Sequence, residues 1–534
     1  MSAHGASMFG RTGRRSGGAM LLSVLVVLLA SALTFWYTFS LRRAEAVGAL
    51  ERSALWRPDP VVVFRYEGRR IDWDFVHSDE LWRPQGRTGP PGPSWLWGLV
   101  PKEGFFRVSS VELYSRYFGG TSIMMGGEDV LKSLEALPEL RSLNLYRAGI
   151  TDHGLRHLER LTNLRRLNLG WCPITDDGLV RLRRLRRLEE LWVGHPDHAL
   201  SEAGLAQLRG LNRLRILHLF SSGIDDARLA YLCKLFPRLE ELFLARSRVT
   251  DDGLSHLRRL VRLRKLQLRF TKISGKGLAY LGSLPALEHL ELDLTEVRGA
   301  DLPRLGGFPA LEVLRIVGAS LGRRGGQRLS SIRGLSELTL AGCTITDEAL
   351  GYLRMAGLQE LDLGSNPITD EGLTRLPLEG LRRLDLSGTR ITDAGLLHLA
   401  SCPSLEELGL AGTMITDHSL RQLAKFPNLR RLDLRQLGKR LSDAGLAQLP
   451  CLPHLQVLRL RGTGITDAGL KALTKFEGLR RLDLGNTRIT DAAVEPLAGL
   501  GRLECINIED TRMTTNGINA LRSALPGCFV RAHW

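Results

Sequence analysis

The sequence lacks the short motifs that mark most enzyme active sites. Its 534 residues contain no phosphate-binding G-x-x-x-x-G-K-[ST] and no dinucleotide-binding G-x-G-x-x-G. His153 and His157 have the spacing of a zinc-binding helix, but the glutamate of H-E-x-x-H is missing. We therefore predict that the chain is not an enzyme and that it uses no cofactor and no metal.

Cysteine is scarce, and the spacing of the cysteines in the sequence suggests no pairs. There are 7 cysteines, an odd number, and none forms a C-x-x-C pair. This excludes a regular disulfide framework and argues against a zinc knuckle. We expect the cysteines to be small buried apolar residues.

Acidic residues are outnumbered, with 57 Asp and Glu against 73 Lys and Arg and a formal charge of +16. Such a charge attracts nucleic acids and anionic lipids when it is concentrated in one patch. Here the arginines are spread along the whole chain, and the densest run is Arg181–Arg187. Dispersed arginines are typical of a solvated surface, so we expect no nucleic acid partner.

Charge is absent from residues 17–41, which contain a long apolar run. About 20 apolar residues span a bilayer as a helix, and Trp36 and Tyr37 lie near one end, as interfacial aromatics do. We predict a single transmembrane helix over residues 19–41, after a disordered Gly-, Ser- and Arg-rich segment, 1–18.

A cleaved signal peptide is the alternative, because Ala30-Ser-Ala32 is an acceptable cleavage site. The apolar run continues to Leu41, which favours an uncleaved signal-anchor. Arginines at 11, 14 and 15 precede the span and two follow it, at 42 and 43. The positive-inside rule then places the rest of the chain outside the cytoplasm.

Residues 42–107 form a separate region that contains five of the nine tryptophans. Two β-rich runs, Val61–Tyr66 and Ile71–Phe75, flank a glycine turn and predict a β-hairpin. Residues 86–93 are rich in Gly and Pro and predict a linker. We interpret the region as a cap on the first repeat of the array that follows, with an aromatic carbohydrate-binding patch as the alternative.

From residue 108 to residue 534 the sequence repeats a unit of 23 to 26 residues. Each unit has the form L-x-x-L-x-L-x-x-T-x-I-T-D-x-G-L-x-x-L, and Val111-Glu-Leu113 fits a degenerate zeroth unit. The L-x-L step of about 16 repeats begins at Leu143, Leu167, Leu191, Leu217, Leu242, Leu266, Leu290, Leu314, Leu338, Leu361, Leu384, Leu408, Leu432, Leu458, Leu482 and Ile506.

The residues of the unit predict its local structure. The L-x-L step is a strand with two leucines inward and one residue outward. A small polar residue, such as Thr389, follows five positions after the first leucine and is suited to bond the turn backbone. Thr392-Asp393 predicts a helix N-cap followed by a carboxylate at the positive end of the helix dipole.

The unit resembles the cysteine-containing subfamily of leucine-rich repeat proteins, which also occurs in F-box ubiquitin-ligase receptors. Asp347, Asp370, Asp393, Asp417, Asp443, Asp467 and Asp491 match the Asp of the subfamily's I-T-D motif, whereas most of its Cys positions are Thr here. The layout is also similar to membrane-anchored bacterial leucine-rich repeat proteins. The resemblance implies an α/β solenoid with a parallel sheet on the concave face and helices on the convex face. Where the Thr-Asp cap is missing, at 297–301 and 321–326, we expect loop or short 3₁₀ structure.

Two groups of outward residues are candidate ligand-binding positions. Trp192, His218 and Phe243 are the outward residues of consecutive strands, flanked two positions along by Tyr146 and Phe220. We expect these aromatics to be exposed, which is the composition of a binding hot spot; the alternative is that they cover each other or meet the N-terminal cap. The second group is Asp362, Asp385, Asp433 and Asp483, for which we expect a ladder of opposite charges with Arg383, Arg431 and Arg481.

The sequence thus predicts a membrane-anchored, non-catalytic scaffold or receptor-like module that binds a protein on its concave face. The alternative is an F-box-like adaptor that recruits targets to a ubiquitin ligase or another enzyme.

Overall fold

The computed structural model describes residues 60–66, 108–115, 131–132, 134–302, 308–353, 355, 357–376, 378–399 and 402–532. The chain divides into two compact units, Met1–Leu214 and Arg215–Trp534. The predicted disordered segment 1–18, membrane helix 19–41 and linker 86–93 lie outside the described residues. Within the described ranges, no helix is long and apolar enough to cross a bilayer.

The first unit begins with an antiparallel pair, in which β1 pairs with β2. The strand predicted over 61–66 is confirmed, but its partner is β2, and the predicted partner 71–75 lies outside the described residues. Strand β2 pairs in parallel with β3, with Val111 opposite Leu143, which confirms the zeroth repeat. The strands are β1 (Pro60–Tyr66), β2 (Val108–Ser115), β3 (Ser142–Asn144), β4 (Arg166–Gly170) and β5 (Glu190–Gly194), and the helices are η2 (Gly154–Leu158), α4 (Asp176–Leu182), α5 (Glu202–Ala206) and η3 (Gln207–Gly210).

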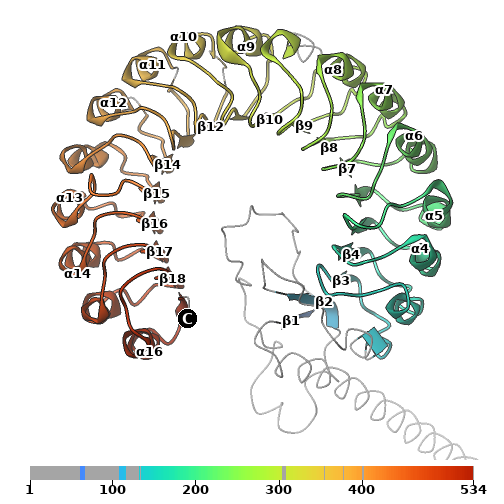
Figure 1. Ribbon diagram of the computed structural model, residues 1–534, viewed down its shortest axis with the longest axis horizontal. Helices are drawn as coiled ribbons and strands as arrows, with labels where there is room; N and C mark the ends of the chain where they lie inside the picture. The colour runs from blue at the N-terminus through green and yellow to red at the C-terminus, as the bar shows by residue number, and fades with distance from the viewer. Residues whose placement is uncertain are drawn as a thin grey trace, which may run out of the picture. The chain divides into compact units, whose positions relative to one another are not determined.

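The second unit is a leucine-rich repeat solenoid whose parallel strands line the inner side of an arc and whose helices form the outer side (Figure 1). Its strands are β6 (Ile216–His218), β7 (Glu241–Phe243), β8 (Lys265–Gln267), β9 (His289–Glu291), β10 (Val313–Arg315), β11 (Glu337–Thr339), β12 (Glu360–Asp362), β13 (Arg383–Asp385), β14 (Glu407–Gly409), β15 (Arg431–Asp433), β16 (Val457–Arg459), β17 (Arg481–Asp483), β18 (Cys505–Asn507) and β19 (Phe529–Arg531).

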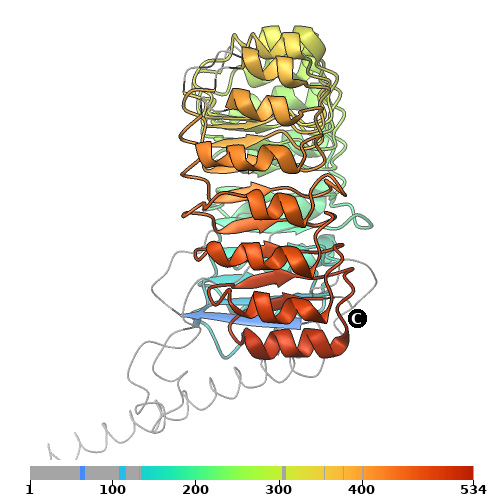
Figure 2. The ribbon, with the colours of Figure 1, turned by 90° about the vertical axis from the view of Figure 1, so that its left-hand side faces the viewer.

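The helices of the second unit are short, and those of the last repeats lie one above another on one side of the strands (Figure 2). They are α6 (Asp226–Leu235), α7 (Asp251–Leu254), η4 (Ser255–Arg259), α8 (Gly275–Leu281), α9 (Gly322–Leu329), α10 (Asp347–Leu350), α11 (Asp370–Arg375), α12 (Asp393–His398), η7 (Asp417–Lys425), α13 (Asp443–Gln448), α14 (Asp467–Leu470), η8 (Lys471–Lys475), η9 (Asp491–Ala493), α15 (Val494–Ala498) and α16 (Thr515–Ala524).

All sixteen predicted repeat starts lie in strands, from Leu143 in β3 to Ile506 in β18. Neighbouring strands pair leucine to leucine, as Leu384 with Leu361, and these side chains are buried. The outward residue of each L-x-L step therefore lies on the opposite face of the sheet from the core. A further strand, β19, pairs with β18 and was not predicted.

The small polar residue bonds the turn backbone in most units, as predicted, although the buried Ser247 hydroxyl has no hydrogen-bond partner among the described residues. The Thr413 hydroxyl donates to the Leu410 carbonyl at 2.7 Å, and the Thr463 hydroxyl donates to the Leu460 carbonyl at 2.6 Å. The Cys172 and Cys343 thiols instead donate to carbonyls of the preceding repeat, those of Leu145 and Ile316, and both thiols are buried. The expectation of small buried cysteines is thus confirmed at this repeat position, and also for Cys233 and Cys402, but it is wrong for Cys451, which is exposed, and for Cys505 and Cys528, which are partly exposed.

The Thr-Asp pair does more than cap its own helix. The Asp370 carboxylate accepts from the backbone N–H of Thr392 at 2.9 Å and from its hydroxyl, both in the next repeat. Equivalent bonds join Asp226 to Thr250 and Asp443 to Thr466. The aspartates therefore form a ladder that ties successive repeats together.

The glycine of the I-T-D-x-G-L motif makes room for this ladder. A Cβ atom on Gly395 would lie 2.3 Å from Oδ1 of Asp370. The same clash would occur between Gly372 and Asp347 and between Gly445 and Asp417. The glycine of the motif is thus required by a contact with the aspartate of the preceding repeat, more than 20 residues away in the sequence.

The expectation of loop or 3₁₀ structure over 321–326 is wrong, because α9 covers this segment from Gly322. Its buried Gly326 packs so closely that a Cβ atom there would lie 2.6 Å from Cβ of Ala349. The glycines thus permit close helix packing rather than a loop. Residues 299–302 do form a 3₁₀ turn, as expected for the unit before.

Candidate binding surface on the inner face

Two positions of each repeat vary in sequence and lie away from the core. The first is the outward residue of the L-x-L step, which forms what we call the inner face. The second is the fourth residue after the first leucine, which we call the rim position. The backbone at the rim position is left-handed in most repeats, with φ of 57° at Arg246 and 64° at Gly412.

In the first unit, the candidate residues Tyr146 and Trp192 are not freely exposed. Trp192 is only 8% exposed, and its indole N–H donates to the Glu190 carboxylate at 2.6 Å. The expectation that this tryptophan is exposed is therefore wrong, since its polar edge is engaged and its ring is covered. Tyr146 is half-buried, and burial raises the pKa of its hydroxyl.

The rim position of the first unit carries side chains that sequence reasoning missed. The Arg147 guanidinium lies 4.5 Å from the ring centroid of Trp171 and 5.6 Å from that of Tyr146. The Trp171 ring in turn meets His195 edge-on, at 6.2 Å. Cations held over aromatic rings in this way are fixed in orientation.

In the second unit, His218 and Phe243 come together. Their rings stack with centroids 3.7 Å apart and an angle of 11° between planes. The Lys265 ammonium lies 5.4 Å from the Phe243 centroid. Burial, and then the Lys265 charge, lower the pKa of His218 well below its usual value, so this imidazole is neutral at physiological pH. For this pair, the alternative that the aromatics cover each other describes the structure better than the expectation that they are freely exposed.

Phe220 belongs to a different group at the rim. The Arg246 guanidinium lies 5.9 Å from the Phe220 centroid and 4.7 Å from the Phe270 centroid. Phe270 is 42% exposed, and Leu294, at the rim position of the next repeat, is 46% exposed. The exposed apolar surface that we expected at Trp192 is therefore found at Phe270 and Leu294.

These rim residues adopt a conformation that disfavours large side chains. Arg246, Phe270 and Leu294 have φ of 57°, 55° and 52°, where a residue with a Cβ atom is strained by about 1–2 kcal/mol. The corresponding rim residues of later repeats include Gly318, Gly342, Gly388, Gly412 and Gly462. A bulky residue where other repeats have glycine is a signal that the sequence alone contains.

The acidic candidates fall into two pairs. Asp362 and Asp385 are opposite each other on β12 and β13. Burial, and then repulsion by Asp385, raise the pKa of Asp362 to about 6. Gly409, the next outward residue, leaves space for Asp385, because a Cβ atom there would lie 2.4 Å from its Oδ1. This pair creates a local excess of negative charge on the inner face.

Asp433 and Asp483 are both close to arginines of the inner face. Asp433 accepts from Nε of Arg435 at 2.9 Å and from Nη1 of Arg459 at 3.4 Å. Asp483 lies opposite Arg459, and burial raises its pKa although nearby arginines, Arg461 first, oppose the shift.

The predicted ladder between these aspartates and Arg383, Arg431 and Arg481 is wrong in its partners. Arg383 pairs with Glu360 at 2.6 Å and with Glu407 at 3.1 Å, and Arg431 pairs with Glu407 at 3.5 Å. Arg383 and Arg431 precede the leucine of the strand and so meet glutamates at the same register position, whereas Arg481 lies opposite Val457 and Cys505. The aspartates, two residues later, meet the outward residues of neighbouring strands instead.

Two family models match the chain. One, described as a leucine-rich repeat region, matches residues 158–331, and a second leucine-rich repeat model matches residues 358–376, 381–400, 451–473 and 479–498. The chain is a leucine-rich repeat protein. A comparison with curated proteins finds no match.

Solved structures of other leucine-rich repeat proteins are similar at low identity. A leucine-rich repeat protein of Leptospira interrogans is 19% identical, with 74% of this chain and 97% of that chain covered and a TM-score of 0.42. An internalin from Listeria monocytogenes is 21% identical over 67% of this chain and 88% of that chain, with a TM-score of 0.34. A plant peptide hormone receptor in complex with its peptide is 16% identical over 74% of this chain and 78% of that chain, with a TM-score of 0.34.

Proposed function

We propose that this leucine-rich repeat protein is a membrane-anchored, non-catalytic scaffold that presents the inner face and rim of its second unit to a protein partner. One observation carries the proposal. Phe270 and Leu294 are exposed apolar side chains held in a left-handed conformation at the rim position, which is glycine in five other repeats, at 318, 342, 388, 412 and 462. Exposed apolar side chains kept in a strained conformation are typical of binding surfaces.

The repeat architecture supports rigid presentation of this surface. The inward leucines and the aspartate ladder are shared by repeats with very different outward residues. A partner that binds such a preformed face orders few side chains, so little of the contact free energy is lost on association. Specificity then resides in the outward and rim residues.

Anchoring and location are the second part of the proposal. Residues 19–41 would span the membrane as an uncleaved signal-anchor, with the solenoid outside the cytoplasm. The uncharged run and the distribution of flanking arginines support this orientation. In the F-box-like alternative the repeats would be cytoplasmic, so digestion of the repeats by protease added to intact cells would exclude that alternative.

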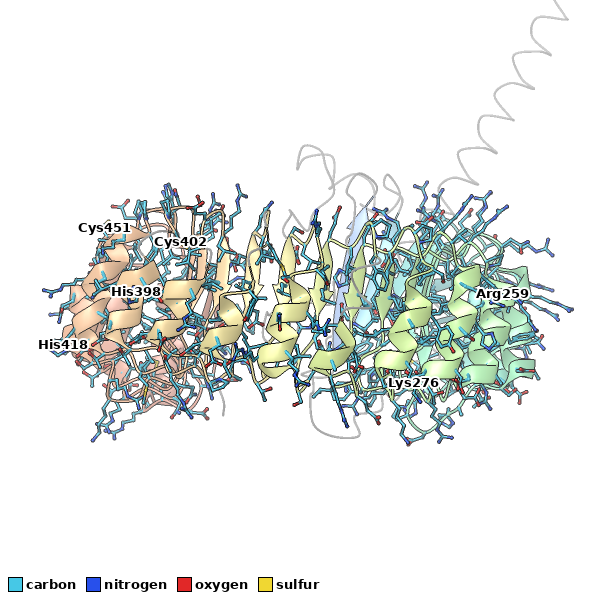
Figure 3. The ribbon with its side chains drawn as sticks, turned by 90° about the horizontal axis from the view of Figure 1, so that it is seen from above. Arg259, Lys276, His398, Cys402, His418 and Cys451 are labelled. Atoms are coloured by element: carbon cyan, nitrogen blue, oxygen red, sulfur yellow. The ribbon has the colours of Figure 1, made fainter. Side chains whose placement is uncertain are left out.

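Photo-crosslinking tests the binding surface with a matched control in the same repeat. Phe270 at the rim and Tyr280 on α8 are similarly exposed, at 42% and 44%. Helix α8 lies on the outer side, where Lys276 is labelled (Figure 3). With p-benzoylphenylalanine at position 270, we expect a discrete crosslinked partner in intact cells, and at position 280 none. Equal crosslinking at both positions, or none at position 270, would contradict the proposal.

Deletion of residues 19–41 tests the anchor separately. We expect the full chain in the membrane fraction after a carbonate wash and the shortened chain in the soluble fraction. Recovery of the full chain in the soluble fraction would remove the membrane part of the proposal and leave the binding surface untouched.

A further inference from the structure

Asp293 is a buried carboxylate that holds two arginines from neighbouring repeats. Its side chain is 1% exposed and lies two residues after β9. Its Oδ2 atom accepts from Nε of Arg315 at 2.7 Å and lies 3.0 Å from Nε of Arg269. The two guanidiniums thus converge on one oxygen from opposite sides along the sheet. We call Arg269, Asp293 and Arg315 the Asp293 cluster.

The two guanidiniums carry more N–H donors than Asp293 engages, and in the part of the chain that the structure describes its Oδ1 atom is buried without a hydrogen-bond partner. Each guanidinium has five N–H donors in a planar fork. The Nε–H of Arg315 donates to Oδ2, whereas the Nε of Arg269 lies 3.0 Å from Oδ2 as an ion pair without hydrogen-bond geometry. The arginine side chains are 25% and 26% exposed, so part of each fork reaches the surface of the inner face. Two positive charges against one negative charge leave the cluster with a net charge of +1.

Charges of both signs surround the cluster. Glu291, opposite Arg315 in the sheet, accepts from Gln267 at 2.6 Å and contacts His289 at 3.0 Å. Lys265 acts on Glu291 from β8 and adds a further positive charge. Asp362, two strands beyond Arg315, adds a negative charge that acts on both Arg315 and Asp293, so the excess positive charge belongs to the cluster itself and not to its wider surroundings.

Exposed apolar side chains border the cluster at the rim. The backbone N–H of Phe270 donates to the Asp293 carbonyl at 2.9 Å, which fixes Phe270 beside the cluster. Leu294 follows Asp293 directly, and it extends over Gly318, where a Cβ atom would lie 2.6 Å from its Cδ2. A ligand that reaches the arginines at this edge therefore meets Phe270 and Leu294 as well.

We propose that the Asp293 cluster is a carboxylate-binding site, at which Arg269 and Arg315 receive a carboxylate of the protein partner while Phe270 and Leu294 contact the apolar residue next to it. The inference rests on the proposed binding function and names the chemistry of one contact. Paired arginines suit a carboxylate because their forks match its two oxygens, and Asp293 fixes their orientation before the ligand arrives.

Short peptides test the site on the full chain, solubilised in a nonionic detergent. The probes are acetyl-Ala-Leu-Phe with a free C-terminal carboxylate, the same peptide as a C-terminal amide, and acetyl-Leu-Glu-Phe-amide. Binding is followed by saturation-transfer NMR up to about 10 mM, since a single contact of this kind binds weakly. We expect the free acid to bind at least about tenfold more tightly than its amide.

The third peptide identifies the source of the carboxylate. Preference for acetyl-Leu-Glu-Phe-amide over the uncharged amide indicates a side-chain carboxylate, whereas preference for the free acid alone indicates a chain terminus. Equal binding of all three peptides, or no binding of any, would overturn the site.

Two variants assign the preference to the cluster. Arg315→Gln should abolish the tenfold preference, and Arg264→Gln should keep it, because Arg264 is an exposed arginine of the same region that pairs with Glu288. If Arg315→Gln does not fold, Arg315→Lys keeps the charge without the planar fork and should reduce the preference. An equal loss in Arg264→Gln would show a nonspecific charge effect and contradict the site. If position 270 crosslinks to a partner but the protein shows no preference for the carboxylate peptides, the carboxylate site is contradicted and the proposed binding function is retained.

Discussion

The repeats around β7 to β10 and those around β11 to β14 share an interior but differ at the surface. In the first group, the rim carries Arg246, Phe270 and Leu294, and the inner face carries the Asp293 cluster. In the second group, the rim carries small residues such as Gly388 and Gly412, and the inner face carries adjacent aspartates. The same backbone thus presents an apolar and cationic surface in one place and a smooth acidic surface in another.

This difference separates what builds the solenoid from what can bind. The leucines are buried in both groups, and the aspartate ladder occurs in both. Left-handed strain and exposed apolar area occur together only where the rim is bulky, among the described residues of the second unit. Four predictions examine whether the two groups differ as their surfaces suggest.

The largest effect is expected for Asp293→Asn. This change leaves two partly buried arginines without their carboxylate, so we expect the free energy of unfolding to fall by about 2–3 kcal/mol. Asp433→Asn is the matched change in a later repeat, where the carboxylate is 14% exposed and also meets two arginines. There we expect a loss of about 1 kcal/mol, because water compensates part of the charge. Equal losses in urea unfolding would show that burial at Asp293 is not special.

The ladder glycines should behave alike in both groups. Gly277→Ala and Gly395→Ala would each place a Cβ atom within 2.4 Å of Oδ1 of the preceding aspartate, Asp251 or Asp370. We expect each change to lower the free energy of unfolding by about 2 kcal/mol. This value is the cost of overpacking after subtraction of the helix propensity that alanine adds relative to glycine. Gly501→Ala is the control, since nothing lies within 4 Å of a Cβ atom there.

Combining Gly395→Ala with Asp370→Ala tests whether the carboxylate causes this loss of stability. With Asp370 removed, Gly395→Ala no longer meets a carboxylate and should cost clearly less than in the parent chain. Unfolding by urea, followed by circular dichroism, measures all variants. A Gly395→Ala cost that is unchanged by Asp370→Ala would show that Asp370 is not what the glycine accommodates.

Sequence reasoning located every strand from β3 to β18, because the leucine period repeats locally and strongly. It missed the ladder, because the Asp370 carboxylate acts on Thr392, a partner that only the stacking of repeats brings near. It was wrong at α9 for a related reason. Glycines at 325 and 326 suggest a loop, whereas in the structure they lie against neighbouring repeats.

The candidate surface was predicted in part. His218 and Phe243 were found from the outward position, but the rim position looked like an ordinary turn. Phe270 and Leu294 interrupt a position that is often glycine, and that contrast becomes meaningful once the left-handed backbone is known. The convergence of Arg269 and Arg315 on Asp293 could not be foreseen, since it depends on side-chain directions across three repeats.

The pH dependence of stability should have opposite signs in the two groups. Asp362 has a pKa of about 6, raised by burial and by Asp385, so the folded state binds more protons than the unfolded state between about pH 4 and pH 6. Its contribution to the free energy of unfolding therefore falls as pH rises through this window, by about 1–2 kcal/mol after allowance for partial exposure. Asp362→Asn should remove this slope.

Glu291 provides the contrasting case. Burial alone would raise its pKa, but hydrogen bonds with His289 and Gln267 lower the pKa to about 2. Its stabilisation is present above the usual glutamate pKa and is lost as pH falls toward 2. Glu291→Gln should therefore reduce the pH dependence of the free energy of unfolding below about pH 4.5. The pH dependence between about pH 4 and pH 6, which belongs to Asp362, should not change. A loss of the pH 4–6 slope in Glu291→Gln would contradict the assignment.

The smallest effect concerns strain at the rim. Leu294→Gly and Leu294→Ala both remove the exposed side chain, but only glycine relieves the left-handed backbone, with φ of 52°. We therefore expect Leu294→Gly to be more stable than Leu294→Ala by about 1 kcal/mol in urea unfolding. Gly412→Ala, at φ of 64° in the smooth group, should lose a similar amount. If Leu294→Ala is as stable as Leu294→Gly, the rim carries no strain, and bulky residues there need no functional explanation.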